Sequence, residues 1–393
     1  MIVLVLNVGT TSFKYKLYDM AAGERVLAQG AADRIGQGDS VWTVSLQDGR
    51  NLSGKCHMKD HAAAIELHLE ELVNAQVIAD MSKVQALGFK AVHGGPIEGA
   101  VKVNEKVLRV MKDFADVAPL HNPPYIVAMR ALRKRLPRVP QVAAFETGFH
   151  QTIPLKRQVY AVPHAWTEKL GIRRYGFHGA SHRYIAERMK RLAPHCRRIV
   201  SLHLGGSSSV CAIENGKSVA NSFGMTLQTG IPHAARSGDF DGFAIMKLLK
   251  SGLSMEAIWK ALGSASGLQG MAGSPDMRDV QAKAAKGDRR ATLAVEVFVE
   301  ACRHYLGAYL AVLGGADAVC FTGGIGQNGA RIRAAILANM EYAGIRLILK
   351  KNGAVRPGME SRVDRGGRGV QIWVLPTNEE LIVARQTVAV LST

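Results

Sequence analysis

Two short segments in opposite halves of the chain follow one scheme of strand, small-residue turn and second strand. Ile2–Asp19 reads IVLVLNVGTTSFKYKLYD, and Ile199–Ile213 reads IVSLHLGGSSSVCAI. In each segment a polar residue ends the first apolar run, Asn7 in one and His203 in the other, before Gly and hydroxyl residues lead into the next run. The pair predicts a duplicated architecture with a ligand between the halves. The alternative is a chance resemblance between two ordinary hairpins.

Apolar runs bounded by Gly or Asn alternate with Ala-, Lys- and Arg-rich stretches along the whole chain, which predicts an α/β protein. The length of 393 residues indicates two or three domains, and the 47% content of hydrophobic residues excludes a disordered chain. We expect strands at Ile2–Leu6, Phe13–Tyr18, Val84–Val92, Gln141–Phe145, Ile199–Leu204, Ser209–Ile213, Ala318–Phe321 and Gln371–Leu375. We expect helices at His61–Val73, Asn122–Leu136, His182–Leu192, Gly242–Lys250, Ser254–Leu262, Gly287–Val312 and Asn328–Ala343.

The chain is strongly basic, with 50 Lys and Arg residues against 32 Asp and Glu and a formal net charge of +18. This charge favours anionic partners such as nucleotides, metabolites, nucleic acids or a membrane surface, and it does not choose among them. Basic clusters with interleaved aromatic residues, which are typical of single-strand readers, are not evident. Nucleic acid is therefore not the expected partner.

The sequence also bears on where the protein works. The N-terminus runs directly into the apolar run Ile2–Leu6 without a basic leader or a cleavage site, so we expect no signal peptide. Leu306–Ile325 is apolar but contains Asp317 and five glycines, and we interpret it as a helix followed by a buried strand rather than a membrane span. The five cysteines are scattered without a CxxC pair, which is typical of reduced structural thiols. We expect a soluble, cytoplasmic protein.

Three loops rich in small residues could present backbone N–H groups to an anion, because such turns let consecutive N–H groups converge. The loops after Asn7 and His203 do not fit the Walker pattern, since each leads into a strand rather than a helix. The third, Phe321–Asn328, follows a strand and opens a helix, which suits close backbone approach to a nucleotide. Taken singly, each loop is a weak signal, because turns rich in Gly and Ser are usually ordinary hairpin turns.

Several histidines stand beside Gly, Pro or strand ends, where loops often hold functional side chains. They are His93, His121, His150, His178, His182 and His203. The spacing of His178 and His182 could place two metal ligands on a helix, but the chain has no HExxH or CxxC motif. We therefore expect histidines that contact phosphate or stabilise charge rather than a zinc site. Arg236-Ser-Gly-Asp239 places a guanidinium, a hydroxyl and a carboxylate on one short loop, which is either functional or an ordinary surface turn.

Strings of residues along the whole chain, in order, resemble the acetate kinase and propionate kinase family. They are NVGTTSFK (7–14), VHGG (92–95), PLHNP (119–123), FHQTIP (149–154), RRYGFHGASH (173–182), HLGGSS (203–208), RSGD (236–239), DMRDV (276–280), FTGGIGQN (321–328) and TNEEL (377–381). The resemblance implies the duplicated, ribonuclease H-like fold of sugar kinases, actin and Hsp70, with a cleft between the domains. It implies an N-terminal domain of residues 1–147 with the tail 381–393, and a nucleotide-binding and dimerisation domain of residues 148–380.

The same resemblance implies a homodimer that phosphorylates a small carboxylate with ATP, in the presence of Mg²⁺ or Mn²⁺. Acetate is the expected substrate, with propionate next, and the products are acyl phosphate and ADP. Two anions must meet in this reaction, so fixed positive charge and a metal are needed to offset their repulsion. The implied metal ligands are Asn7 and Glu379, and the implied catalytic residues are Lys90, Glu146, His178 and Arg236.

The remaining roles also follow from the resemblance. The residues implied to bind the carboxylate are Lys90, Val92, Leu120, His121, Phe177 and Leu227. The residues implied to bind ATP are Lys14, His203, Leu204, Gly205, Gly206, Ser207, Asp276, Met277, Arg278, Gly324, Ile325, Gly326, Gln327 and Asn328.

The chain departs from the family pattern at a few of these positions. Lys90 stands where the family has arginine, and Glu146 where it has its catalytic aspartate. Leu227 replaces a proline and Gln327 a glutamate, and the resemblance almost vanishes over residues 225–235. Arg and Lys are not equivalent where a bidentate grip is used. A carboxylate kinase is the leading hypothesis. The alternatives are a paralogue acting on another small acid or phosphoryl donor, and a nucleotide- or nucleic-acid-binding protein that has lost turnover.

Overall fold

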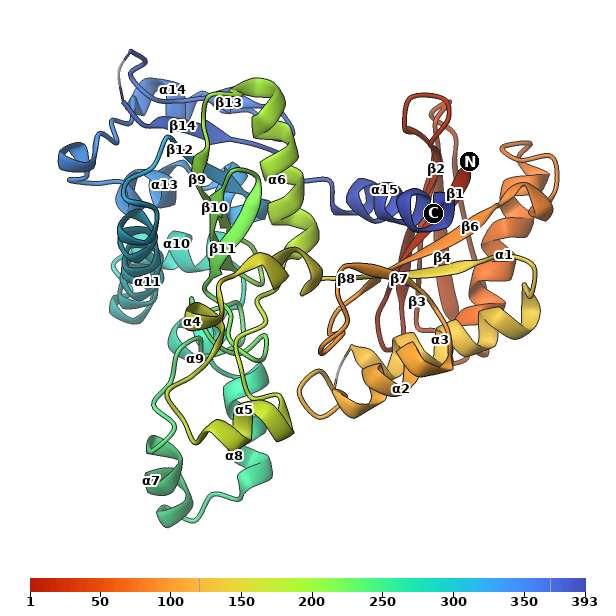
Figure 1. Cartoon of the computed structure of the whole chain (residues 1–393), viewed down its shortest axis with the longest axis horizontal. Helices are drawn as coiled ribbons and strands as arrows, with labels where there is room; N and C mark the ends of the chain where they lie inside the picture. Colours follow the sequence, from red (N-terminus) through yellow and green to blue (C-terminus); the bar gives the residue numbers. More distant parts are fainter. Residues whose placement is uncertain (120, 368) are drawn as a thin grey trace. The chain divides into compact units, whose positions relative to one another are not determined.

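The computed structural model describes residues 1–119, 121–367 and 369–393, which form two compact units (Figure 1). The first unit comprises Met1–Gln151 and Asn378–Thr393, and the second comprises Thr152–Thr377. Each unit is built around one β-sheet and has its own hydrophobic core.

The first unit contains an eight-stranded sheet in the order β5-β4-β3-β2-β1-β6-β8-β7. Strands β1 and β2 pair as an antiparallel hairpin, and β1, β6 and β8 run parallel to one another. The strands are β1 Ile2–Val8, β2 Phe13–Asp19, β3 Arg25–Asp33, β4 Ser40–Leu46, β5 Asn51–Cys56, β6 Ala86–Ala91, β7 Ala100–Lys102 and β8 Gln141–Phe145.

Helices cover both faces of this sheet because β1 alternates its side chains between the two faces. Leu4 and Leu6 belong to the core formed with α1, α2 and α3, whereas Val3 and Val5 pack with α15. The chain therefore returns to this unit at its C-terminal end to cover the second face. The helices are α1 His61–Asn74, η1 Met81–Lys83, α2 Glu105–Asp113, α3 Asn122–Arg135, η2 Gly148–Thr152 and α15 Glu379–Ser392.

The second unit contains a six-stranded sheet in the order β11-β10-β9-β12-β14-β13. Its centre repeats the scheme of the first unit: β9 and β10 form an antiparallel hairpin, and β9, β12 and β14 are parallel. The strands are β9 Arg198–His203, β10 Ser209–Glu214, β11 Lys217–Asn221, β12 Ala318–Thr322, β13 Ser361–Arg362 and β14 Gln371–Val374. The two hairpins expected from the sequence are thus confirmed, and the strands beyond them repeat as well.

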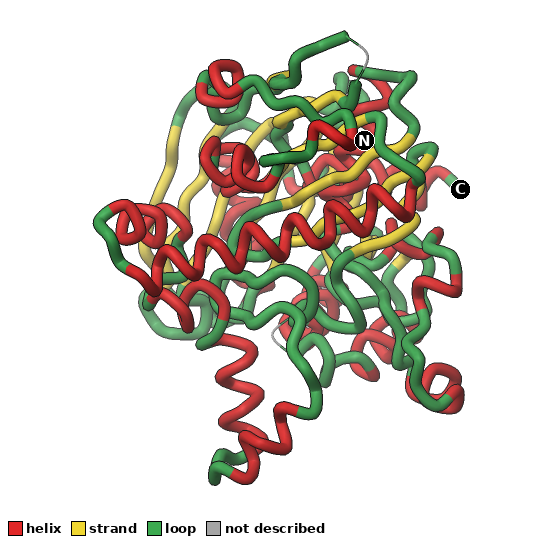
Figure 2. The backbone as a smooth tube through the Cα atoms, turned by 90° about the vertical axis from the view of Figure 1, so that its left-hand side faces the viewer, coloured by secondary structure: helices red, strands yellow, loops and turns green. Residues whose placement is uncertain are grey.

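The long helix α11 packs against β9 and β10 of the second sheet, and in Figure 2 it crosses in front of the strands. Its residues Phe298, Cys302 and Leu306 are fully buried. None of the described helices is both long and apolar enough to cross a membrane. The helices are α4 Leu155–Gln158, α5 His164–Leu170, α6 Gly179–Leu192, α7 Ala244–Lys250, α8 Met255–Ser264, α9 Gly267–Ala272, α10 Met277–Ala285, α11 Arg289–Leu313, α12 Gly323–Asn328, α13 Ala330–Ile336, η3 Glu341–Ala343 and α14 Leu349–Gly353.

The expected α/β class is confirmed, and one expected helix is corrected. The single helix expected at Asn328–Ala343 is α13 and the short η3, because Asn339 adopts a left-handed φ of 58° that ends the helical path. The expected helix and buried strand in Leu306–Ile325 are the end of α11 and β12. Strands β3, β4 and β5 were not expected from the sequence.

Candidate functional site

The first strand of the chain ends at a hydrogen-bonded pair formed by Asn7 and Tyr125. The Tyr125 hydroxyl, from α3, donates to Oδ1 of Asn7 (3.1 Å) and accepts the N–H of Val8 (3.0 Å). Burial raises the pKa of Tyr125, so its hydroxyl keeps its proton and remains a donor. Lys14 lies opposite Asn7 in the β1–β2 pair, with an exposed side chain. Tyr125 therefore orients the amide of a predicted metal ligand.

Lys90, in β6, forms an ion-pair cluster with two carboxylates. Its ammonium contacts Oε2 of Glu379, the first residue of α15, and lies 3.6 Å from Oε1 of Glu146, which directly follows β8. The side chains of Lys90, Glu379 and Glu146 are 19%, 13% and 7% exposed. Burial disfavours the ammonium, but the charges of Glu379 and Glu146 outweigh it and raise the pKa of Lys90. Three predicted residues from distant parts of the chain thus meet.

The VHGG segment after β6 is tied to the start of α3 by Asn122. The Asn122 amide donates to the carbonyl oxygen of His93 (3.0 Å), and its Oδ1 accepts the N–H of His93 (3.3 Å). Beside these residues, Val92 is buried and His121 is the N-cap residue of α3. The two predicted residues Val92 and His121 are therefore held near each other. Leu120, predicted for the same pocket, lies outside the described residues.

In the second unit, two glycine-rich segments pack backbone against backbone. The segment 203–208 connects the last residue of β9 to β10, and the segment 323–328 is α12, directly after β12. The N–H groups of Ile325 and Gly326 donate to the carbonyl oxygen of Leu204 (2.8 and 3.0 Å). Gly323 has a φ of 77°, and a Cβ there would lie 2.5 Å from that oxygen. Only glycine permits this approach, which explains the residue at the start of α12.

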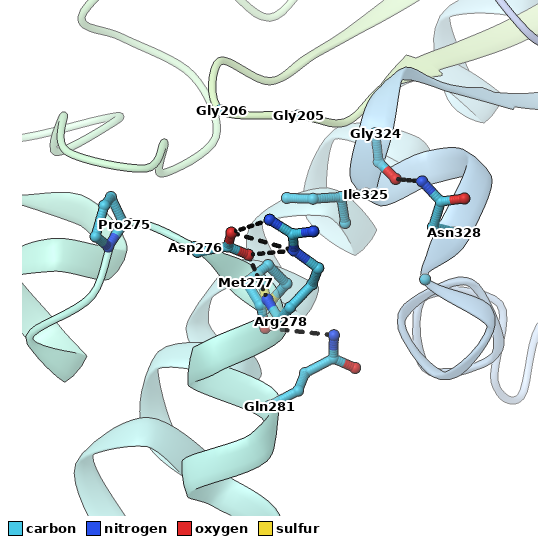
Figure 3. A pocket seen from close by; sticks show the side chains of 11 residues that line it. Gly205, Gly206, Pro275, Asp276, Met277, Arg278, Gln281, Gly324, Ile325 and Asn328 are labelled. Carbon is cyan, nitrogen blue, oxygen red and sulfur yellow. Dashed lines mark hydrogen bonds and ion pairs between the residues drawn. The ribbon is translucent and has the colours of Figure 1, made fainter. Parts of the chain in front are cut away.

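A pocket of about 450 Å³ opens beside these segments, within the size range of small-molecule sites (Figure 3). Figure 3 shows three walls, formed by the 205–206 backbone, by α12 and by the start of α10. The structure thus unites the three segments predicted to bind nucleotide. The lining residues are Gly205, Gly206, Pro275, Asp276, Met277, Arg278, Gln281, Gly324, Ile325, Asn328 and Gly329.

Asp276 and Arg278 form an ion pair on one wall of this pocket. Nη2 of Arg278 donates to Oδ2 of Asp276 (2.5 Å), and the N–H of Arg278 donates to Oδ1 (2.8 Å). These bonds hold the pKa of Asp276 at about 2. The Arg278 side chain is 86% exposed, so an anionic ligand can reach its guanidinium without a conformational change that exposes it.

Gly326 and Gln327, also predicted to bind nucleotide, lie on α12 but do not line the pocket. Their carbonyl oxygens accept hydrogen bonds from Nη1 of Arg333 (2.8 and 2.7 Å). The buried Arg333 guanidinium also bonds to Asn352 (Nε to Oδ1, 2.7 Å). Arg333 thus closes the C-terminal end of the helix that forms one pocket wall. Nothing in its helical sequence context distinguishes it from a surface arginine.

His178 is the N-cap residue of α6 and has a left-handed backbone conformation, with φ 57° and ψ 33°, which costs energy for a residue other than glycine. Its Nδ1 lies 2.8 Å from Oγ of Ser209, and the same oxygen lies 2.8 Å from Nε2 of His182. The rings of His178 and His203 are 4.1 Å apart between centroids, and Oγ of Ser181 lies 2.8 Å from Nδ1 of His203. Two predicted histidines therefore meet, oriented by serine hydroxyls.

Arg236 lies in the segment 224–239, called here the arginine loop, which lies between β11 and α7. Its Nη1 donates to the carbonyl oxygen of Leu227 (2.6 Å), another predicted residue of the same loop. Burial lowers the pKa of Arg236 to about 10, which leaves the guanidinium charged at neutral pH.

The arginine loop is bonded to the glycine-rich segment 203–208. Nδ1 of His233 accepts the N–H of Ser208 (3.0 Å), and the N–H of Ala234 donates to the carbonyl oxygen of Gly206 (2.9 Å). Burial and the charge of Arg236 lower the pKa of His233 to about 3, so the ring stays neutral and can accept. His233 lies where the family resemblance fails, so sequence reasoning missed it, as it missed Tyr125 and Ser209. Their partners are distant in sequence, and no local signal marks them.

The predicted residues fall into two sets, one in each unit. Asn7, Lys14, Lys90, Val92, His121, Glu146 and Glu379 belong to the first unit. Phe177, His178, His203, Leu204, Gly205, Gly206, Ser207, Leu227, Arg236, Asp276, Met277, Arg278, Gly324, Ile325, Gly326, Gln327 and Asn328 belong to the second.

The donor set of the predicted metal site fits Mg²⁺. Asn7 and Glu379 supply an amide oxygen and a carboxylate, which are hard ligands. The described residues contain no group of three or more His, Cys, Asp or Glu able to hold a metal ion. An amide oxygen and a carboxylate suit an ion that keeps several waters and relies on substrate phosphates.

Comparison with known proteins gives one consistent result. The model of the acetokinase family matches residues 2–385. The chain is 39% identical over 396 residues to the acetate kinase of Shouchella clausii, covering 99% of each chain. Two crystal structures align over 99% of each chain: the acetate kinase of Porphyromonas gingivalis (TM-score 0.92, 35% identity) and a propionate kinase of Francisella tularensis (TM-score 0.90, 32% identity). They confirm the duplicated fold of the sugar kinase and actin type. The chain belongs to the acetokinase family, whose members are phosphotransferases with a carboxylate acceptor.

Proposed function

We propose that this protein is an ATP-dependent carboxylate kinase that converts acetate and ATP reversibly into acetyl phosphate and ADP. A carboxylate oxygen forms a bond to the γ-phosphorus, the bond from that phosphorus to the β–γ bridging oxygen breaks, and ADP leaves with the electron pair. The observation that carries the proposal is the pocket in which Gly205, Asp276 and Gly324 meet, in a chain of this family.

The second unit supplies the groups for the nucleotide and the transferring phosphoryl group. We assign the adenosine to the pocket of Figure 3 and the phosphates to the segment 203–208. Arg236 contributes a fixed positive charge that is already partly desolvated. A desolvated charge stabilises a transition state more than a solvated charge does. His178 and His203, oriented by Ser209 and Ser181, donate to phosphoryl oxygens.

The first unit supplies the groups for the acceptor and the metal. Lys90 binds a carboxylate oxygen, Glu146 and Glu379 hold that ammonium in place, and Val92 lines the acyl site. Asn7 and Glu379 would hold Mg²⁺ or Mn²⁺, which when bound offsets the negative charge of the phosphates. Lys90 also keeps the two carboxylates from repelling the incoming acid.

The choice of acid is tested with a hydroxylamine-trapped acyl phosphate assay over formate, acetate, propionate and butyrate, with ATP and Mg²⁺. Val92 is a β-branched wall, and Leu227 adds bulk where the family has proline. An added methylene changes specificity by about 1–3 kcal/mol, so we expect kcat/KM to be higher for acetate than for butyrate. A preference for butyrate contradicts this choice of acid, and no reaction with any of the four acids overturns the proposed function.

We further propose a cytoplasmic homodimer in which the first unit, Met1–Gln151 with Asn378–Thr393, is the acceptor domain and the second unit, Thr152–Thr377, is the nucleotide and dimerisation domain. These boundaries lie a few residues from the predicted ones at 147/148 and 380/381. Self-association is supported by exposed apolar side chains in the second unit, with Phe243 86%, Met246 55% and Trp259 57% exposed. Multi-angle light scattering checks the assembly, and a monomeric mass at micromolar concentration contradicts it.

A further inference from the structure

The arginine loop contains no helix or strand, yet it must present Arg236 in one position. A guanidinium on an unsupported loop would lose most of its value, because a small misplacement of a charge in an active site lowers the rate steeply. The contacts that hold this loop are therefore part of the machinery, even where they are far from any ligand.

Asp239 closes the part of the loop that contains Arg236. Its Oδ1 accepts the N–H of Gly230 (2.8 Å), and its own N–H donates to the carbonyl oxygen of Gly230 (2.9 Å). Between them, Gly238 packs so closely that a Cβ would lie 2.6 Å from that same carbonyl oxygen. The two hydrogen bonds between Gly230 and Asp239 thus close residues 230–239 into a ring, and we call this pair the neck of the arginine loop. Arg236 lies within the closed segment.

Tyr305 fastens this neck to the core of the second unit. Its hydroxyl, from α11, donates to Oδ2 of Asp239 (2.5 Å), which is short, as expected for a hydrogen bond to a carboxylate. Burial and the hydrogen bond to Asp239 raise the pKa of Tyr305, so the phenol stays protonated and remains a donor. Helix α11 is the longest element of the unit, and its side chains Phe298, Cys302 and Leu306 are fully buried in the core. It is therefore a rigid support.

We propose that Tyr305 and Asp239 are positioning residues that act through Arg236: the phenol anchors the neck of the arginine loop to α11 and thereby fixes the guanidinium for phosphoryl transfer. The proposal deepens the proposed function and rests on it for its kinetic consequences. Neither residue lines the nucleotide pocket of Figure 3. Their effect should therefore fall on kcat rather than on ATP binding.

The chain offers a matched pair of variants for a test. Tyr305→Phe removes only the hydroxyl. Tyr305 and Asp239 border a pocket of about 820 Å³, from which water can solvate the Asp239 carboxylate in the variant. The variant should therefore fold. Tyr309→Phe is the control, because Tyr309 lies one turn further along α11, lines the same pocket and makes no hydrogen bond to Asp239 in the described structure.

The first measurement is kinetic, with acetate and ATP. We expect Tyr305→Phe to lower kcat about 10-fold with the KM for ATP nearly unchanged, and Tyr309→Phe to change kcat by less than about 2-fold. In the Arg236→Ala background, Tyr305→Phe should lower kcat by less than about 2-fold, because the group through which it acts is gone. An equal loss in both backgrounds overturns the proposal.

The second measurement does not depend on activity. Hydrogen exchange of the peptide amides in residues 224–239 should be about 10-fold faster in Tyr305→Phe than in the wild type or in Tyr309→Phe, because the loop opens more often. Unchanged exchange overturns the proposal even if kcat falls. If the wild type phosphorylates none of the four acids, the proposed function is wrong, whereas exchange still decides whether Tyr305 holds the loop.

Discussion

The sequence resemblance places Lys90 and Glu146 where the family is expected to have an arginine and an aspartate. In the structure Nζ of Lys90 lies 3.6 Å from Oε1 of Glu146. Lysine is one atom shorter than arginine, and glutamate is one methylene longer than aspartate. The summed reach of the pair is therefore the same as that of the family's pair. Glu379 contacts the same ammonium, so a change in the length of the Lys90 side chain alters its contacts with both Glu146 and Glu379.

This geometry predicts that the two substitutions compensate each other. We expect Lys90→Arg and Glu146→Asp each to lower kcat/KM for acetate, and the double variant to recover much of the loss. Side chains in contact couple by about 0.5–3 kcal/mol, which a double-mutant cycle resolves. Thermal unfolding of all four proteins separates lost activity from lost fold. Strictly additive effects on kcat/KM would show that the two substitutions do not compensate each other.

A second prediction at this scale concerns the charge of Arg236. Its guanidinium is held by the carbonyl oxygen of Leu227 and stays charged at neutral pH. Arg236→Ala should lower kcat by about 10²-fold or more without a comparable loss of stability, because preorganised charge acts mainly on the transition state. Arg356→Ala, at an exposed arginine of the same unit, is the control. Near-normal turnover of a folded Arg236→Ala protein means that the assigned role is wrong.

At the scale of elements, α1 packs on the first sheet through a histidine set among aromatic rings. The His68 ring lies 5.0 Å from those of Phe13 and Tyr15 and 5.9 Å from that of Trp42, between centroids. Among the described residues, neither ring nitrogen of His68 has a hydrogen-bond partner, and neither has the Tyr15 hydroxyl. Burial lowers the pKa of His68 to about 4. This packing therefore requires the neutral ring.

The buried ring predicts a loss of stability in acid. In the unfolded chain His68 binds a proton near pH 6.5, whereas in the folded protein it does so near pH 4. The full contribution of neutral His68 to the free energy of unfolding is therefore present above pH 6.5. It is lost as the pH falls from 6.5 to 4, and the loss is about 2 kcal/mol at pH 5. His68→Phe should reduce the difference in urea-unfolding free energy between pH 7.5 and pH 5. The control His57→Phe, at an exposed histidine, should leave this difference unchanged. If wild type and His68→Phe show the same pH dependence, the acid sensitivity does not come from His68.

At the scale of the whole molecule, the two units repeat a sheet topology but carry different chemistry. The first holds the cluster of Lys90 with Glu146 and Glu379, and the second holds the pocket of Figure 3, the pair His178 and His203, and Arg236. A duplicated scaffold can diverge in this way because function resides in the loops at the strand ends rather than in the sheet.

This division predicts which amides a nucleotide protects. ADP with Mg²⁺ should slow hydrogen exchange in residues 203–208, 276–281 and 323–329, because these form the pocket of Figure 3. Residues 40–56, in β4 and β5 of the first unit, should be unchanged and serve as the internal control. Protection confined to the first unit, or absent from the three segments, contradicts the placement of the nucleotide.

Much of the fold follows from short stretches of sequence. The hairpins Ile2–Asp19 and Ile199–Ile213 and the strand before Gly323 were predictable, because short apolar runs bounded by glycine-containing turns are a local signal for strands. β3 and β5 were not, since their sequences RVLAQGAAD and NLSGKC contain glycine and few β-branched residues. They become strands through pairing with neighbours, which a local pattern does not encode.

The site divides in the same way. By itself the sequence determined the family, the glycine-rich segments and most of the residues that line the pocket of Figure 3, because these are contiguous strings with local backbone requirements. Only the tertiary structure decided that Lys90 is shared by Glu146 and Glu379, that Tyr125 orients Asn7, and that Tyr305 holds the arginine loop. Each of these contacts joins segments far apart in sequence. Which side chains meet there depends on how sheets and helices pack, and on burial that makes an unpaired charge or hydroxyl costly.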